Sequence, residues 1–310
     1  MQWRDECIIL SLKAFSESSR IVTVFNKSLG KTSGLVNGMK ASIQPGDVSD
    51  VSWRGRSAER LGTLTVENVF SPFVHVFKNS SGIFAIDSAC SMCRNGMPEK
   101  APHPELFDEL KSLMLAISRG DWIVDYVFFE MKFLSEVGFG LDLSKCALTG
   151  ATEGLAYISP KTGCAVTAEA GEKYKDKLFK LPDFLLPGCR TQNRGFSVLK
   201  EDGFRGSVGT PDELLHHDNT DFVQLDPDVA LRAPLDDEKH YNYTQQKAKP
   251  LAPILQELPM QNETPVVQPL RLGHIFLALK ITGHFLRSYF CGINNKTLPF
   301  SRDCLIESIL

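Results

Sequence analysis

Apolar residues follow a strand period near the N-terminus and a helix period further along the chain. Five short apolar or alternating segments lie between residues 6 and 70, separated by turn residues such as Gln44-Pro45-Gly46. The segments span residues 7–12, 20–25, 31–36, 47–56 and 61–70. Five short strands in so short a stretch favour a small closed barrel. We predict an α+β chain with a five-stranded OB-fold over residues 1–80, although an SH3-like barrel would give nearly the same pattern.

The period changes after residue 80. Helices are expected over residues 83–94, 103–118 and 122–137. In the second of these, apolar residues recur at helical spacing: Leu106, Phe107, Leu110, Leu113, Met114 and Ile117. Asp121 is the expected N-cap of the third helix, and Gly138 follows its end, where glycine readily adopts the left-handed conformation. The third helix is apolar almost all round, so we expect it at the centre of a helical domain over residues 81–310.

Residues 144–168 predict a zinc-finger-like hairpin whose metal ligands are depleted. Strands over residues 155–159 and 164–167 flank a turn, and Cys146 and Cys164 are two of the four ligands that a closed zinc site needs. Cys90 and Cys93 lie one turn apart on a helix with no second pair nearby, which favours apolar packing. We therefore expect no metal and no cofactor.

An acidic segment over residues 190–265 interrupts the helical domain. Residues 200–265 hold thirteen Asp or Glu against six Lys or Arg, a net charge of −7, and show no sustained period. Such a composition favours disorder, so we treat the segment as an insertion, with short helices conceivable at residues 211–216 and 252–258. A helix over residues 270–290 should follow it and pack against the helix over residues 122–137.

Composition narrows the class of protein. The 310 residues carry a net charge of only −3, but the first 82 hold ten Lys or Arg against seven Asp or Glu, a net charge of +3. A basic barrel followed by an acidic tract fits polyanion binding at one end. No apolar run approaches the roughly 20 residues of a membrane span, and eight scattered cysteines favour reduced thiols. We expect a cytoplasmic protein.

The basic residues of the barrel are the candidate DNA contacts. Arg54 and Arg56 are two apart on an expected strand and share a face, while Val51 and Trp53 share the other. The full candidate set is Lys13, Arg20, Lys27, Lys31, Lys40, Arg54 and Arg56. Phe15 and Phe25 are candidates for base stacking. A solvated edge strand would show the same arginine spacing.

No catalytic motif accompanies these residues. The chain lacks a Walker A loop, a nucleophile elbow, an H-E-x-x-H sequence and a dinucleotide-binding glycine fingerprint. His103, between two prolines at a helix start, suits a structural role. We expect a protein that is not an enzyme. A protein-interaction module acting through the acidic insertion is the alternative, and a cysteine-dependent enzyme is a more distant one.

The chain resembles the RecO family of bacterial DNA repair proteins in the order and spacing of its motifs. One is Gly138-Phe139-Gly140-Leu141-Asp142. The other matching segments are 3–10, 17–25, 30–38, 44–46, 53–56, 102–107, 129–130, 157–160, 163 and 279–286.

This resemblance implies an N-terminal OB-fold, then a helical domain with a zinc-finger-like insert. It implies binding to single- and double-stranded DNA and annealing of complementary strands. It also implies loading of RecA on DNA coated by single-stranded-DNA-binding protein (SSB), together with RecR, in the RecF pathway. SSB would be recognised through its acidic C-terminal tail, and the protein would be associated with the nucleoid.

Three features depart from the family pattern. The basic loop after Gly38 is reduced to residues 39–42, where Lys40 is the one cation. The zinc ligands are depleted. Family members often carry arginine at the position of Phe128, where it would help to grip the SSB tail; Lys111, Arg119 or Lys132 are the cations that would compensate.

Overall fold

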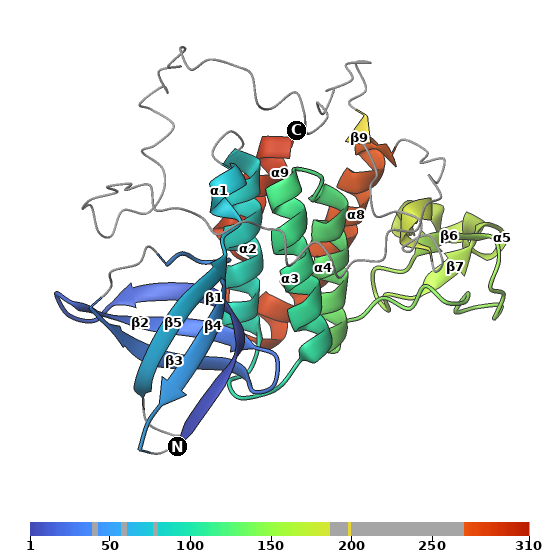
Figure 1. Cartoon of the computed structure of the whole chain (residues 1–310). Coiled ribbons are helices and arrows are strands. Elements are labelled where there is room, and N and C mark those ends of the chain that lie inside the picture. Colours follow the sequence, from blue (N-terminus) through green and yellow to red (C-terminus); the bar gives the residue numbers. More distant parts are fainter. Residues whose placement is uncertain (39–42, 57–60, 77–79, 187–197, 200–269, 310) are drawn as a thin grey trace, which may run out of the picture. The chain divides into compact units, whose positions relative to one another are not determined.

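The computed structural model describes residues 1–38, 43–56, 61–76, 80–186, 198–199 and 270–309. Its N-terminal part is a closed barrel with the strand order β1-β2-β3-β5-β4 (Figure 1). The strands are β1 (Gln2–Ala14), β2 (Ser19–Asn26), β3 (Gly30–Asn37), β4 (Val48–Arg54) and β5 (Gly62–Phe70). All pairs are antiparallel except β3 with β5. This closure is that of an OB-fold, so the predicted fold class is confirmed.

Strand β1 is longer than expected because it pairs with two neighbours. Its first half pairs with β4 and its second half with β2. The continuous apolar run in its middle is buried on both faces: Cys7 and Ile9 pack in the interior of the barrel, whereas Ile8 and Leu10 belong to the core shared with the helices. An apolar run without alternation is therefore explained by two-sided burial.

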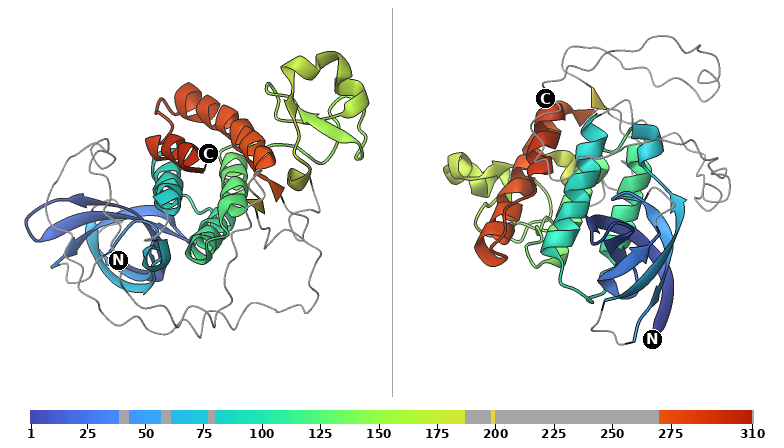
Figure 2. Two further views of the ribbon diagram at one scale, coloured as in Figure 1. Left: turned by 90° about the horizontal axis from the view of Figure 1, so that it is seen from above. Right: turned by 90° about the vertical axis from the view of Figure 1, so that its left-hand side faces the viewer.

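The helices form a bundle beside the barrel. They are α1 (Phe73–Val76), α2 (Ser80–Gly96), α3 (Pro104–Arg119), α4 (Ile123–Glu136), α8 (Leu272–Arg287) and α9 (Phe300–Ile309), with a π-helical turn, η5 (Ser288–Ile293), after α8. The six predicted core residues of α3 are all buried. Figure 2 shows α8 alongside α4 and α9 alongside α2, and contacts join both pairs. Helix α8 with η5 corresponds to the helix predicted over residues 270–290, and its predicted packing against α4 is confirmed. Helix α9 is not among the predicted elements.

The ends of α4 test two further predictions. Gly138 has φ +84° and its N–H donates to the carbonyl of Ser135, as expected of a glycine that closes a helix. The prediction of Asp121 as N-cap is wrong. Trp122 occupies the N-cap position without a side-chain cap, and Asp121 instead lies 3.6 Å from Arg119.

The insert is a three-stranded sheet in the order β7-β6-β8. Strands β6 (Leu155–Ile158) and β7 (Ala165–Thr167) form the predicted hairpin, and β8 (Phe179–Lys180) adds an unexpected third strand. Three short helices, α5 (Ala168–Gly171), η1 (Glu172–Lys177) and η2 (Asp183–Leu185), complete it.

Most of the acidic segment falls outside the described residues, including both helices conceivable within it. Within residues 190–265 the structure describes β9 (Val198–Leu199), which pairs in parallel with β10 (Leu270–Arg271) immediately before α8. No helix of the described residues is long and apolar enough to cross a membrane.

Candidate functional site

One outward-facing row of side chains crosses all five strands of the barrel. The register pairs each member with the next across β1, β2, β3, β5 and β4: Lys13, Ile21, Leu35, Thr63 and Arg54. Every member is partly or fully exposed. Because β4 also pairs with β1, the row runs around the barrel, and its two ends lie on adjoining strands. Lys13 lies near the end of β1, whereas Gln2, the partner of Arg54, lies at its start. It has an apolar middle and a cation at each end.

Two further exposed cations lie near the ends of this row. Arg20 precedes Ile21 and is paired with Ala14 and Val36, so its side chain leaves from the other face at the start of β2, and Arg56 follows two residues after Arg54. All four cations are exposed, and none forms an ion pair with another described residue. The prediction that Arg54 and Arg56 share one strand is wrong, since β4 ends at Arg54, and Arg56 lies in the bend that follows. The alternation before it holds: Val51 and Trp53 are buried and Arg54 is exposed.

The remaining predicted cations have other surroundings. Lys27 is exposed but its Nζ lies 2.8 Å from Oδ1 of Asp108 on α3. Lys31 is buried, and its Nζ donates to the carbonyl oxygens of Arg94 at 2.7 Å and Met97 at 2.6 Å, at the end of α2. A helix C-terminus has unpaired carbonyls that a cation satisfies well. Lys31 therefore joins the barrel to α2, and its ammonium group does not face solvent. Lys40 lies outside the described residues.

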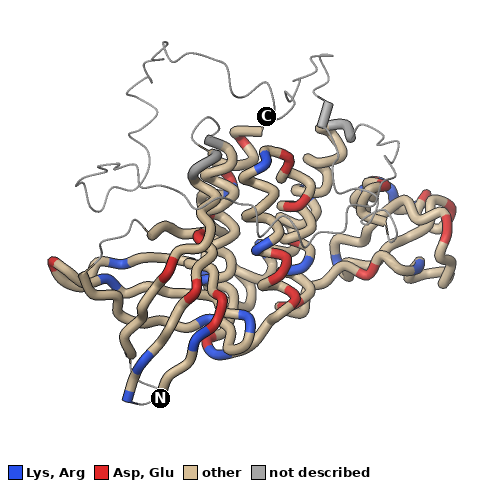
Figure 3. Tube along the Cα trace, in the orientation of Figure 1, with Lys and Arg blue, Asp and Glu red and all other residues tan. Residues whose placement is uncertain are grey.

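A second row on the barrel is acidic. Glu6, Asp50 and Glu67 are paired across β1, β4 and β5 (Figure 3). Arg4 lies 3.3 Å from both Asp50 and Glu67, and Lys111 of α3 lies 2.7 Å from Glu6. A polyanion would be repelled by this row, so the surface along the Lys13–Arg54 row is better suited to phosphates.

Aromatic side chains are placed differently from the prediction. Phe25 is fully buried and packs edge-on against Phe107 of α3, with ring centroids 5.8 Å apart, so its prediction as a stacking residue is wrong. Phe15, in the turn after β1, is 61% exposed. Trp3 is partly exposed and stacks on Trp53 at the Arg54 end of the row. Sequence reasoning missed Trp3, although its place opposite Trp53 follows from pairing β1 with β4.

The predicted zinc-finger-like element is held by hydrogen bonds. The buried sulfur of Cys146 accepts from the backbone N–H of Thr167 at 3.4 Å and lies 3.7 Å from its hydroxyl. Burial opposes ionisation of Cys146, but hydrogen bonds from the Thr149 side chain and from nearby backbone N–H groups outweigh it and lower its pKa to about 6. The hydroxyl groups of Thr149 and Thr167 thus lie against the Cys146 sulfur, in a place where a zinc site would have further metal ligands. No cluster of three metal-binding side chains occurs among the described residues.

The cations proposed to grip an acidic tail are all engaged in ion pairs. Lys111 pairs with Glu6, Arg119 with Asp121, and Lys132 with both Glu105 and Glu136. Phe128 is buried and packs edge-on against Phe184 of the insert. The ring of His103, which the sequence placed in a structural role, lies 2.8 Å from Glu136 and so ties the start of α3 to the end of α4.

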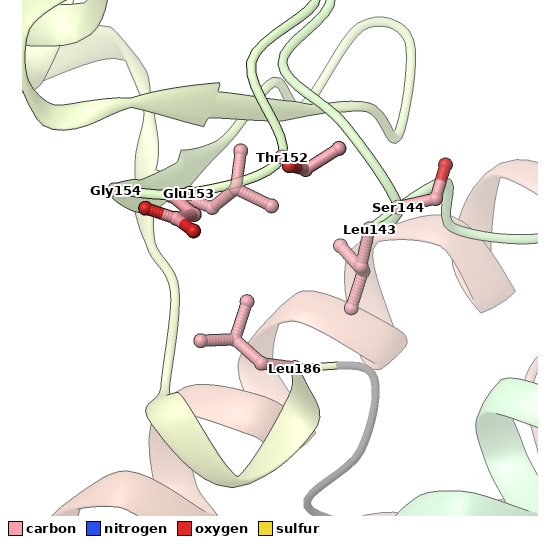
Figure 4. A pocket seen from close by; sticks show the side chains of 7 residues that line it. Leu143, Ser144, Thr152, Glu153, Gly154 and Leu186 are labelled. Atoms are coloured by element: carbon pink, nitrogen blue, oxygen red, sulfur yellow. The ribbon is translucent and has the colours of Figure 1, made fainter.

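A hollow in the insert is separate from the barrel surface. Its volume is about 500 Å³, and it is lined by Leu143, Ser144, Thr152, Glu153, Gly154, Leu155 and Leu186 (Figure 4). No cation lines it, and Glu153 disfavours acidic ligands. It does not resemble a catalytic or phosphate-binding pocket.

Comparisons with known proteins agree with the two-part architecture. Residues 1–73 match the family model for the N-terminal part of recombination protein O, and residues 82–202 match that for its C-terminal part. The DNA repair protein RecO of Cereibacter sphaeroides is 39% identical over 191 residues, which cover 60% of this chain and 80% of that protein. The proteins of the same name from Rhodospirillum centenum and Bradyrhizobium diazoefficiens are 37% and 38% identical, and 77% and 84% of them are covered.

Proposed function

The chain belongs to the RecO family of DNA repair proteins, and we propose that it binds single- and double-stranded DNA through its barrel. The carrying observation is the outward row that ends in Lys13 and Arg54, with the exposed Arg20 and Arg56 near its ends. Unpaired cations attract phosphates and release condensed counterions, whereas the acidic row on β1, β4 and β5 excludes DNA from that part of the barrel.

The apolar middle of the row supports binding to single strands in particular. Ile21 and Leu35 are opposite each other and partly exposed. The strand 2–3 face and the loops after strands 1 and 4 are where OB-folds hold oligonucleotides. Phosphates at the cationic ends and bases over the apolar middle would give binding without sequence preference.

We further propose that this binding serves strand annealing and recombination mediation. The protein would align complementary strands by neutralising their phosphates. It would help to load RecA on SSB-coated single-stranded DNA together with RecR. On this proposal it is not an enzyme, since charge neutralisation and alignment need no bond chemistry, and it works at the nucleoid. Residues 1–80 would be the DNA-binding domain and residues 81–310 the helical domain that meets protein partners.

Binding of the SSB tail would compete with ion pairs that the chain already forms. Because Lys132 already contacts two carboxylates, an acidic tail must displace Glu105 or Glu136 to reach it. We therefore expect weaker tail binding than a free cation would give. Titration of the full chain with an acidic SSB-tail peptide, compared with the Glu105→Gln variant, tests this: tighter binding by the variant supports competition at Lys132.

The salt dependence of DNA binding tests the main proposal. Replacing both Arg54 and Arg56 with alanine should weaken binding to any sequence and lower the slope of log affinity against log salt by about one to two. The control replaces Lys173 and Lys180, two exposed lysines of the insert, and removes the same charge. Equal slopes in the wild type and the Arg54/Arg56 variant would reject the assignment. Absence of salt-dependent binding by the wild type would favour a protein-interaction role instead.

A further inference from the structure

Trp3 and Trp53 form a stacked pair at one end of the barrel. They occupy directly opposite positions on β1 and β4, and their rings are parallel within 3° with centroids 6.3 Å apart. Trp53 is 6% exposed, whereas Trp3 is partly exposed. Trp53 thus belongs to the barrel interior, and Trp3 reaches the surface.

The backbone around Trp53 holds this pair in place. A Cβ atom at Gly55 would lie 2.5 Å from the indole of Trp53, and one at Gly62 would lie 2.3 Å from it. Only glycine permits so close an approach at these two positions. Met1 and Gly55 also exchange two backbone hydrogen bonds, of 2.8 and 3.1 Å, which tie the start of β1 to the end of β4. Trp3 therefore rests on a rigid support.

The surroundings of the pair suit a nucleotide. Arg54 follows Trp53 in β4, so its side chain leaves from the opposite face of the strand, and Arg56 lies in the bend just beyond. Both are exposed at this end of the barrel without a carboxylate partner among the described residues. An exposed aromatic ring and unpaired cations at the same end of the barrel offer stacking to a base and attraction to the phosphates of the same strand.

We propose that Trp3 is a base-stacking site for an unpaired nucleobase at the end of the barrel where β1 begins and β4 ends. This inference rests on the proposed DNA binding and adds a way to discriminate single strands from paired duplex. A base stacked on Trp3 must be free of its partner strand, so the site acts on single strands and contributes nothing to a paired duplex. Phosphate contacts at Arg54 and Arg56 serve both forms of DNA.

Phe15 provides the matched comparison. It is also an exposed aromatic beside cations, because it follows Lys13 and lies near Arg20. It differs in its support: it is in a turn, and its ring stacks on no other described aromatic ring. A ring without a fixed orientation loses more freedom on binding, so its contribution to stacking should be the smaller one.

The experiment measures affinity of the full-length protein for a thymidine oligonucleotide and for an abasic oligonucleotide of equal length. The wild type should bind the thymidine strand more tightly. Trp3→Leu keeps an apolar cover on Trp53 but removes the π face, and should lower affinity for the thymidine strand by about 5- to 30-fold. Affinity for the abasic strand, and the salt slope on both, should stay within about twofold of the wild type, since the phosphate contacts remain. Trp3→Phe should restore most of the preference, and Phe15→Leu should retain it.

The result separates this inference from the function on which it rests. An unchanged preference for thymidine over abasic DNA in folded Trp3→Leu protein overturns the stacking site and leaves DNA binding by the barrel intact. Absence of salt-dependent binding by the wild type overturns both. Near-ultraviolet circular dichroism of each variant verifies that the barrel is folded.

Discussion

Arg302 and Glu130 form a buried salt bridge between α9 and α4. Nε of Arg302 lies 2.6 Å from Oε1 of Glu130, and the two side chains are 1% and 0% exposed. Thr282 of α8 also donates to Glu130, and Arg302 donates to the carbonyl of Leu279 at 2.7 Å. The two charges thus connect α4 with α8 and α9, although Glu130 lies 152 residues before Thr282 and 172 residues before Arg302.

Removing one member of this pair should be costly. Arg302→Leu leaves Glu130 buried without its counterion, and the free energy of unfolding should fall by about 3–5 kcal/mol. The double variant with Glu130→Leu removes both charges and should recover much of the loss. Chemical denaturation of the three proteins measures this. A double variant less stable than Arg302→Leu would contradict the argument.

Lys31 should matter for stability and not for the salt dependence of DNA binding. Lys31→Met removes the donor to two carbonyl oxygens at the end of α2, which should cost about 1–3 kcal/mol. The salt slope on single-stranded DNA should remain that of the wild type. Lys27→Met, which breaks an exposed ion pair, should cost less than about 1 kcal/mol. A slope lowered by about one in Lys31→Met would instead return this lysine to the DNA interface.

Asp47 should make stability depend on pH. Burial raises the pKa of its carboxyl from 3.8 to about 6, although hydrogen bonds from Ser71 and Gln44 oppose the shift. Between about pH 4 and 6 the folded protein therefore keeps a proton that the unfolded chain has released. Stability should fall as pH rises through that window, by up to about 2–3 kcal/mol.

The Asp47→Asn variant tests this effect. An amide is neutral throughout, so the variant should lose this part of the pH dependence. Thermal unfolding between pH 4 and 8, with exposed Asp87→Asn as the control, gives the comparison. The same slope in Asp47→Asn and the wild type would show that another group titrates.

The insert should hold no stoichiometric zinc. Elemental analysis of protein purified without chelators should give well under one equivalent, because Cys146 and Cys164 are two ligands of the four required. Converting Thr149 and Thr167, the two residues whose hydroxyls contact Cys146, to cysteine should create a site that binds about one zinc. One tightly bound zinc in the wild type would refute the first expectation, and an unmetallated double variant would refute the second.

The charge of the acidic segment should compete with DNA for the barrel. Residues 200–265 carry a net charge of −7, and opposite charges attract most strongly at low salt. Replacing these residues with a short Gly/Ser linker should raise DNA affinity at low salt and have little effect at high salt. Equal affinities at every salt concentration would remove the competition hypothesis.

Alternation and helical spacing predicted correctly the strands and helices that bury one continuous face. Trp53 is buried and Arg54 is exposed, as the alternation along β4 predicts. The buried face of α3 includes the apolar residues at helical spacing. In both cases the sequence pattern reports one continuous interface. Lys31 was misassigned since a lysine after a glycine turn normally faces solvent, and its partners are carbonyl oxygens more than 60 residues away. No local pattern records such a contact.

The other errors have similar causes. Helix α9 is not predicted because its buried face includes Arg302, which breaks an apolar period and finds its partner 172 residues earlier. Asp121 was chosen as a cap from its residue type, whereas the helix begins two residues later and the carboxylate pairs with Arg119. The position of Trp3 opposite Trp53 follows only from the register of β1 with β4.

The shared core has a consequence for synthesis on the ribosome. Ile8, Leu10, Phe25, Val48 and Phe70 of the barrel pack in the same cluster as the buried residues of α2, α3 and α4. When the last barrel strand leaves the exit tunnel, these side chains have no partners yet, and Lys31 has no helix end to cap. The nascent barrel must therefore wait for α2 and α3, with apolar surface open to chaperones, before its outward row acquires a fully stable support.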